Sequence, residues 1–230
     1  PFTPERIQGN GLAGFEPGTH ILGGVAFDAR GVVQLNGRDY VKTNESQRFS
    51  PSVTHIPVRQ SFSKIHFLHG TIGNTTDGTR IGTYILRYAD GLTQVIPIVY
   101  GRGVRNWWWY RTEPQEATDA TVVWEGANEM CSKANTTLRI FKMTVGNKRP
   151  DVRIDTVDFV SEMTRCAPFL IAMTVTADSP DDPEFWWAKA RVWEEQADVL
   201  QALATLDQGI QRLTNNPVLW NVKGTLLGKT

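Results

Sequence analysis

Apolar and polar positions alternate along much of the first 178 residues. The alternation is clearest in residues 169–176, where Phe169, Ile171, Met173 and Val175 occupy every second position. A period of two sends successive side chains to opposite faces of a β-strand. This segment therefore predicts a strand with one buried face.

Other short apolar runs, separated by Gly, Pro, Asn and Asp, extend this pattern. They lie at residues 21–27, 32–35, 64–70, 81–89, 92–99, 105–110, 121–124, 137–145 and 152–160. In the last run the apolar parity changes at Val157, which predicts a β-bulge. The pair Asp90-Gly91 is typical of the type I′ turn in a β-hairpin. About ten strands without a convincing helix predict a mostly β fold, an antiparallel β-sandwich or jelly roll.

The pattern changes abruptly after residue 178. Apolar residues now recur every three or four positions, at Val199, Leu203, Leu206, Ile210 and Leu213. This spacing lines one face of an α-helix. Residues 179–183 predict a linker and a helix start, with Asp182 as the N-cap and Pro183 at the first helical position. The sequence therefore predicts a β-domain at residues 1–178 and a helical segment at residues 179–230.

The helical segment repeats itself after 34 residues. At this offset Trp186 recurs as Trp220, and Ala190 recurs as Gly224. The period, and the small residue four positions after a large aromatic one, resemble the tetratricopeptide repeat. The resemblance implies that these four residues form an interface between repeats, and that the array binds a peptide or another subunit. The alternative is an ordinary helical hairpin that caps the β-domain.

The β-domain also resembles a known group. The motifs lie at residues 23–35 (GGVAFDARGVVQL), 64–71 (KIHFLHGT), 88–91 (YADG), 96–101 (IPIVYG) and 104–108 (VRNWW). They resemble a β-sandwich domain of large extracytoplasmic and regulatory proteins in planctomycetes and verrucomicrobia. Those domains are similar to galactose-binding-like, carbohydrate-binding jelly rolls. The resemblance implies that fold and an extracytoplasmic location, periplasmic or at the cell surface, but it implies no particular ligand.

The net charge, the longest apolar run and the number of cysteines narrow the range of partners that the chain could bind. Lys plus Arg and Asp plus Glu both number 24, so the net charge is zero and no general electrostatic attraction to nucleic acid arises. The longest apolar run, residues 167–173, is far shorter than the roughly 20 residues of a membrane-spanning helix. Because the chain starts at Pro1, we interpret it as a processed product or part of something longer. Cys131 and Cys166 fit no zinc or redox spacing, and either a disulfide or two free thiols is compatible with the sequence.

The run Trp107-Trp108-Trp109-Tyr110 is the strongest candidate for a ligand site. On a strand, successive rings would face opposite sides, so both faces would need a cover to be buried. Exposed rings stack on sugars, and nearby arginines donate hydrogen bonds to hydroxyl groups. We therefore take these four residues, with Arg102 and Arg105, as ligand-binding candidates, and Arg111 as a further donor. The alternative is that one pair of rings belongs to the core and the other packs on the helices.

Metal binding and catalysis have weaker support. His66 and His69 would point to opposite faces of a strand, so a shared metal is not expected. The polar loop at residues 73–79 suits either a calcium site or a plain turn, and we favour the turn. No nucleophile, phosphate-loop or metalloprotease motif occurs. The loop carboxylates that remain as candidates for an acid/base pair are Glu113, Glu116, Glu125 and Glu129.

These patterns together predict a non-enzymatic binding or scaffold protein without cofactor or metal. The helical repeats would bind a protein partner or a larger assembly, and the sandwich would be the recognition domain. The first alternative is a carbohydrate-binding module that uses exposed aromatic side chains. The weaker alternative is a glycoside hydrolase-like enzyme that uses the loop carboxylates.

Overall fold

The computed structural model describes residues 11–12, 14–39, 49–176, 183–195, 198–214 and 216–228. In these residues the chain is mostly β, and the strands of its sheets pair in antiparallel fashion. The chain divides into two compact units, Pro1–Thr176 and Ala177–Thr230. The predicted linker at residues 179–182, with the N-cap Asp182, lies outside the described residues.

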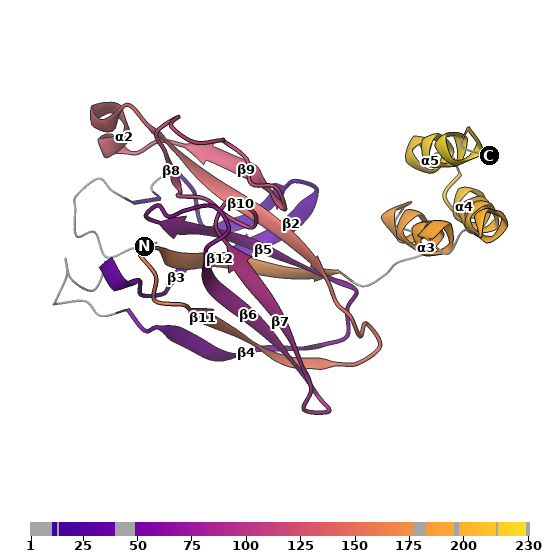
Figure 1. The fold of residues 1–230 in the computed structure, drawn as a ribbon, viewed down its shortest axis with the longest axis horizontal. Helices are drawn as coiled ribbons and strands as arrows, with labels where there is room; N and C mark the ends of the chain where they lie inside the picture. The colour runs from indigo at the N-terminus through magenta and orange to yellow at the C-terminus, as the bar shows by residue number, and fades with distance from the viewer. Residues whose placement is uncertain are drawn as a thin grey trace. The chain divides into compact units, whose positions relative to one another are not determined.

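Two sheets form the body of the first unit, here called the β-unit (Figure 1). The larger sheet has the order β3 (Val33–Gln34), β12 (Ala167–Thr176), β5 (Lys64–Ile72), β10 (Thr137–Gly146) and β8 (Trp108–Trp109), and β9 (Ala120–Gly126) also pairs with β10. The smaller sheet has the order β4 (Ser52–Gln60), β11 (Ile154–Ser161), β6 (Arg80–Tyr88) and β7 (Thr93–Val99). A separate hairpin pairs β1 (Gly18–Leu22) with β2 (Val25–Ala29).

The facing sides of the two sheets share one core. Phe67 of β5 stacks on Tyr84 of β6 with ring centroids 3.8 Å apart, and Tyr84 stacks on Phe159 of β11 at 4.9 Å. Leu68, the next residue of β5, belongs to a second core that also contains Phe27 of β2. Both faces of β5 are covered, so its residues 65–71 are all buried, including the polar side chains of His66, His69 and Thr71. Two antiparallel sheets that share a core are consistent with a β-sandwich.

Glycine geometry corrects two local predictions. Residues 21–27 form the ends of β1 and β2 rather than one strand, because Gly23 and Gly24 turn the chain with φ of 54° and 77°. The hairpin between β6 and β7 is confirmed. Of its two turn residues only Gly91 has positive φ, 86°, so the turn is not the predicted type I′.

Two elements of the β-unit were not predicted. Strand β4 carries residues with positive φ at His55 and Arg59, next to register shifts against β11, and these interruptions hide its alternation. The short helix α2 (Glu129–Ala134) begins after Asn128, whose side chain accepts hydrogen bonds from two helix N–H groups. The register of β11 against β4 shifts between Val157 and Phe159, where the change of apolar parity predicted a bulge.

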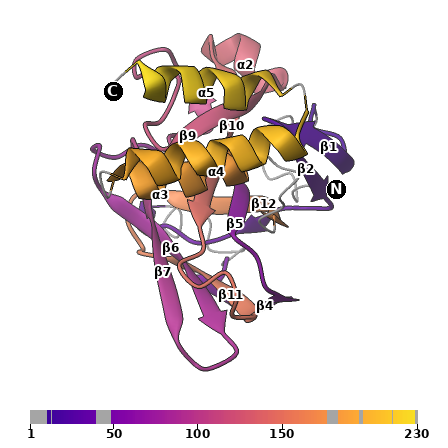
Figure 2. The ribbon, with the colours of Figure 1, turned by 90° about the vertical axis from the view of Figure 1, so that its right-hand side faces the viewer.

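The second unit, here called the helical unit, contains α3 (Pro183–Glu195), α4 (Val199–Arg212) and α5 (Pro217–Leu227). In Figure 2, α4 and α5 run beside each other, and α4 packs against both α3 and α5. Prolines begin α3 and α5, and the side chains of Asp198 and Asn216 cap α4 and α5. None of the helices in the described residues is long and apolar enough to span a membrane.

Candidate functional site

The four predicted aromatic residues lie in different environments. Trp107 is buried in the second core, where its ring meets Phe169 edge-on at 5.9 Å. Trp108 and Trp109 are half-buried on the short strand β8, and Tyr110 is 46% exposed. Only the outer part of the run is therefore accessible to a ligand, and we call residues 108–116 the aromatic loop.

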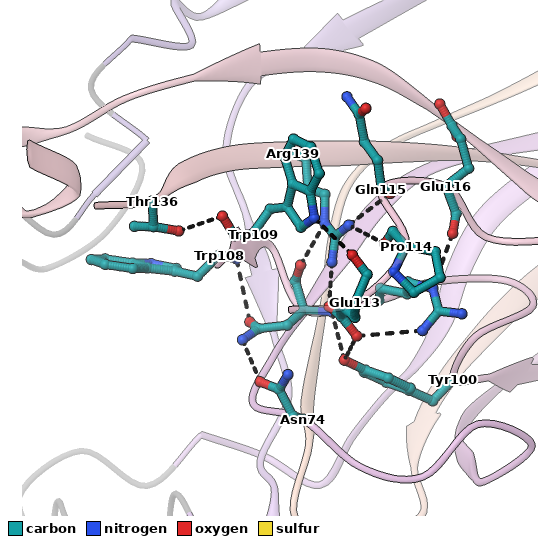
Figure 3. Close-up of polar contacts among 12 residues, drawn as sticks. Asn74, Tyr100, Trp108, Trp109, Glu113, Pro114, Gln115, Glu116, Thr136 and Arg139 are labelled. Carbon is teal, nitrogen blue, oxygen red and sulfur yellow. Dashed lines mark hydrogen bonds and ion pairs between the residues drawn. The ribbon is translucent and has the colours of Figure 1, made fainter. Parts of the chain in front are cut away.

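A buried arginine holds the aromatic loop in place. Arg139 of β10 is fully buried, and its guanidinium donates to the backbone oxygens of Asn106, Pro114 and Gln115 at 2.7–2.9 Å and to the carboxylate of Glu113 (Figure 3). The Trp109 ring lies 5.9 Å from the Arg139 guanidinium carbon. A planar group with five donors suits this cluster of carbonyl oxygens, which a loop without regular pairing would otherwise leave unsatisfied.

A second buried arginine fixes the other side of the loop. Arg105 makes a bidentate pair with Asp77 at 2.8–2.9 Å and donates from Nε to the Glu116 backbone oxygen at 3.0 Å. Glu113 accepts from Arg105, Arg139 and the Tyr100 hydroxyl, the last at 2.8 Å. We expected Arg105 to bind a ligand, but it is buried and its nitrogens are used inside the protein. Asp77 likewise belongs to this network, in keeping with a structural turn at residues 73–79.

The electrostatics of this network follow from burial. Burial lowers the pKa of Arg139, although the neighbouring Glu113 carboxylate opposes the shift. Burial also raises the pKa of Tyr100, and its hydrogen bond to Glu113 adds to the shift. Two guanidinium groups and a phenol hold the Glu113 carboxylate, so this residue anchors the loop instead of serving as an exposed acid or base.

The accessible part of the loop is an aromatic edge. Trp108 stacks on Tyr110 with ring centroids 5.9 Å apart. Exposed Arg111, at a φ of 61°, places its guanidinium carbon 5.3 Å from the Trp109 ring centroid. Arg102 instead pairs with Asp119 at the surface. This edge can offer a ring face and a cationic donor to a ligand.

The two histidines of β5 have separate structural roles. His66 contacts the hydroxyls of Thr144 and Thr176, whereas His69 contacts the Tyr84 hydroxyl at 3.1 Å and the Gly103 backbone oxygen at 3.0 Å. Burial lowers the pKa of His69 to about 4, so the ring is neutral near pH 7. In the part of the chain that the structure describes, no three His, Cys, Asp or Glu side chains form a group suited to a metal ion.

The structure also places the other candidate carboxylates and the two cysteines. Glu116 accepts from the Val122 N–H at 2.7 Å, Glu125 accepts from the Gln115 side chain, and Glu129 is exposed in the first turn of α2. Cys131 and Cys166 are both free and buried, so the two-thiol alternative holds. Burial raises the pKa of Cys166 to about 12, which leaves it a protonated thiol.

An open depression of ≈ 690 Å³ lies away from the predicted ligand residues. Its walls come from β4, β11 and the segment before β11: His55, Pro57, Arg59, Arg153, Asp155 and Thr156. Arg153 and Asp155 pair with each other at 2.9 Å. The depression contains no aromatic-loop residue, so volume alone does not identify it as the binding site.

The repeat-related residues of the helical unit fall into two classes. Trp186 and Ala190 of α3 are buried against α4. Their counterparts on α5, Trp220 and Gly224, are exposed, Trp220 to 55%. The sequence predicted all four as one kind of interface, but in the described residues only the α3 pair is covered.

Sequence reasoning missed Arg139, and it took Glu113 as a candidate acid or base although this residue anchors the aromatic loop. A charged residue between Leu138 and Ile140 was the available signal, because an arginine inside a buried strand needs partners. Those partners lie 24 to 33 residues away, so sequence spacing could not identify them. No family model matches this chain, and no curated protein matches it either.

Proposed function

We propose that this chain is a non-catalytic binding or scaffold protein whose helical unit contacts a protein partner. The observation that carries the proposal is the exposed side of α5, where Trp220 is 55% exposed. Large aromatic residues are usually buried, and exposed tryptophans often anchor protein interfaces. The zero net charge favours a partner bound by apolar contacts over nucleic acid.

The internal repeat supports a tetratricopeptide-like organisation of the helical unit. Residues 34 positions apart have matching types, and Pro183 and Pro217 begin α3 and α5. Such units stack through equivalent helix faces and use the remaining surface for partners. The 34-residue spacing thus agrees with a docking role for the exposed face.

Strand order supports a jelly-roll identity for the β-unit. Four strands of one sheet run β3-β12-β5-β10 and those of the other run β4-β11-β6-β7, with β8 and β9 inserted between β7 and β10 in sequence. Two interlocked Greek keys produce this order in jelly rolls. A galactose-binding-like family and an extracytoplasmic location remain predictions from the resemblance.

A pull-down with the full-length chain tests the scaffold role. Trp220→Asp places a charge on the exposed face of α5 without altering a buried side chain. We expect it to lose proteins that the unmodified chain retains from an extract of the source cells. Leu200→Asp is the matched control, because Leu200 is 82% exposed on α4. Identical retained proteins for all three baits would contradict the proposal.

Carbohydrate recognition is the second candidate, supported by the aromatic edge. Tyr110 is 46% exposed, stacks on Trp108 and lies next to Arg111 in the chain. A glycan array with the full-length chain tests this role. Binding that disappears in Tyr110→Ala but persists in Leu92→Ala, a control at an exposed hairpin residue, would support it. An array without signal for the unmodified chain would eliminate it.

A further inference from the structure

The open depression on the smaller sheet lies where β4 is bulged twice. His55 and Arg59 each belong to a bulge that sets two residues of β4 opposite one residue of β11. Both have a left-handed φ, 60° for His55 and 56° for Arg59. Both line the depression, with Pro57 between them. Bulges re-aim side chains and are common beside active sites, so this pair gives the depression a feature beyond its volume.

The two bulges differ in their support from within the protein. The N–H of His55 donates to one carboxylate oxygen of Asp158 at 2.8 Å, and Arg87 donates to the other at 2.6 Å. This carboxylate accounts for the conformation of His55. Among the described residues, no hydrogen bond or ion pair engages the exposed side chain of Arg59. A strained residue whose charged group has no partner inside the protein is typical of a ligand site.

Cationic groups outnumber carboxylates around the depression. Arg59 from β4 and Arg153 from the segment before β11 line it together with His55, and Asp155 is the single acidic residue among its described lining residues. Asp155 pairs with Nε of Arg153 at 2.9 Å, and no other described side chain engages the terminal nitrogens of that guanidinium. Because the whole chain has no net charge, this positive excess is local.

The arrangement of the donors favours a tetrahedral oxyanion as the ligand group. One guanidinium can satisfy a planar carboxylate through two parallel hydrogen bonds. Here Arg59 and Arg153 come from two segments, and the hydroxyl-bearing Thr156 lies on the wall as well. Donors on several sides suit an ion whose oxygens point in several directions. The depression, at ≈ 690 Å³, is much larger than one such ion, and the Pro57 ring adds an apolar surface for the remainder of a ligand.

We propose that the depression over β4 and β11 binds a small molecule through a phosphate or sulfate ester group. Arg59 and Arg153 are the charged donors, and His55 and Thr156 add hydrogen-bonding groups. All these residues belong to the β-unit. The inference therefore goes beyond the proposed function and does not depend on the helical unit.

A nuclear magnetic resonance titration of the full-length, ¹⁵N-labelled chain tests the proposal. The probes are methyl phosphate and methyl sulfate, added at constant ionic strength so that general screening does not change. We expect saturable shifts for at least one of them, centred on the backbone amides of residues 55–59 and 153–156. The two arms separate the sources of the oxyanion, and acetate is the planar comparison, which should bind more weakly than the better monoester.

Two charge-removing variants test the donors. Arg59→Asn and Arg153→Gln should each weaken binding at least tenfold, because each removes a charged donor, and asparagine tolerates the left-handed φ at position 59. Arg30→Gln is the matched control and should leave binding unchanged. Like Arg153, Arg30 pairs through Nε with an aspartate two residues away, Asp28, but it lies outside the depression.

A variant with the opposite expected sign separates binding from damage to the fold. Asp155→Asn removes the carboxylate that repels an anionic ligand and should strengthen binding by roughly threefold. Four outcomes would overturn the proposal: neither monoester gives saturable shifts, acetate binds as tightly as the better monoester, Arg59→Asn leaves binding intact, or Arg30→Gln weakens it as much as Arg153→Gln.

Discussion

The β-unit and the helical unit differ in where they place side chains that are unfavourable in their surroundings: a charged group in the core of one, and a large aromatic group at the surface of the other. The β-unit buries the guanidinium of Arg139 and surrounds it with the backbone oxygens of Asn106, Pro114 and Gln115. The helical unit leaves an indole, Trp220, more than half exposed although its counterpart Trp186 is buried. The β-unit therefore uses its unusual residue for internal order, whereas the helical unit leaves one of its large aromatic residues at the surface.

The number of layers explains the difference. In the β-unit both faces of β5 are covered, so polar groups inside must find partners within the unit. In the helical unit three helices enclose a single core, and α5 can turn only one side toward it. In repeat proteins, the outer side of such a helix is typically buried by a neighbouring repeat.

Removing the charge of Arg139 should have the largest effect. Arg139→Met leaves the Glu113 carboxylate with fewer donors and three backbone oxygens without theirs. We expect the free energy of unfolding of the β-unit to fall by about 3–5 kcal/mol, as when one partner of a buried ion pair is removed. Urea unfolding followed by region-resolved hydrogen exchange measures this without involving the helical unit.

The matched control for that change is Arg102→Met. Arg102 pairs with Asp119 at the surface, where both side chains are more than half exposed. Such a pair contributes about 0–1 kcal/mol. If the two variants were equally stable, the buried network would not be what orders the aromatic loop, and the contrast between the units would lose its basis.

Acid should destabilise the β-unit through His69. Burial lowers its pKa from 6.5 to about 4. Between these pH values the unfolded chain binds a proton that the folded chain does not, so stability falls as the pH decreases through this window. The loss reaches roughly 3 kcal/mol and is complete near pH 4. Unfolding free energies measured from pH 7 to pH 4 give the slope.

Two variants separate His69 from other titrating groups. His69→Gln should be less stable at pH 7 yet show a flatter pH dependence, because an amide does not titrate. His55→Asn is the control: His55 is exposed, and asparagine tolerates its φ of 60°. An unchanged slope in His69→Gln would show that another group causes the acid sensitivity.

Local periodicity was enough to predict the strands and helices that keep one apolar face along their whole length. The alternation from Phe169 to Val175 lies within β12, and the spacing from Val199 to Ile210 lies within α4. It failed for β4, because the interruptions at His55 shift the alternation out of phase. It also failed for the site: the run of rings was visible, but the burial of Trp107 depends on the distant Phe169.

The smallest expected changes in stability come from replacing each of two glycines, Gly209 and Gly224, with alanine. The pair compares a helix face that is covered by another helix with one that is open. In Gly209→Ala the new methyl group meets Trp186, so we expect a loss of about 1–3 kcal/mol from the helical unit. In Gly224→Ala no described atom lies within 4 Å of the new methyl group, and the better helix propensity of alanine should stabilise the unit by about 0.5–1 kcal/mol. Thermal unfolding followed by far-UV circular dichroism measures both signs. Since the two changes add the same atom to helices of one unit, opposite signs can come only from what lies over each glycine. A loss of stability in both variants would mean that Gly224 of α5 is covered as Gly209 of α4 is, and the open face would no longer distinguish the helical unit from the β-unit.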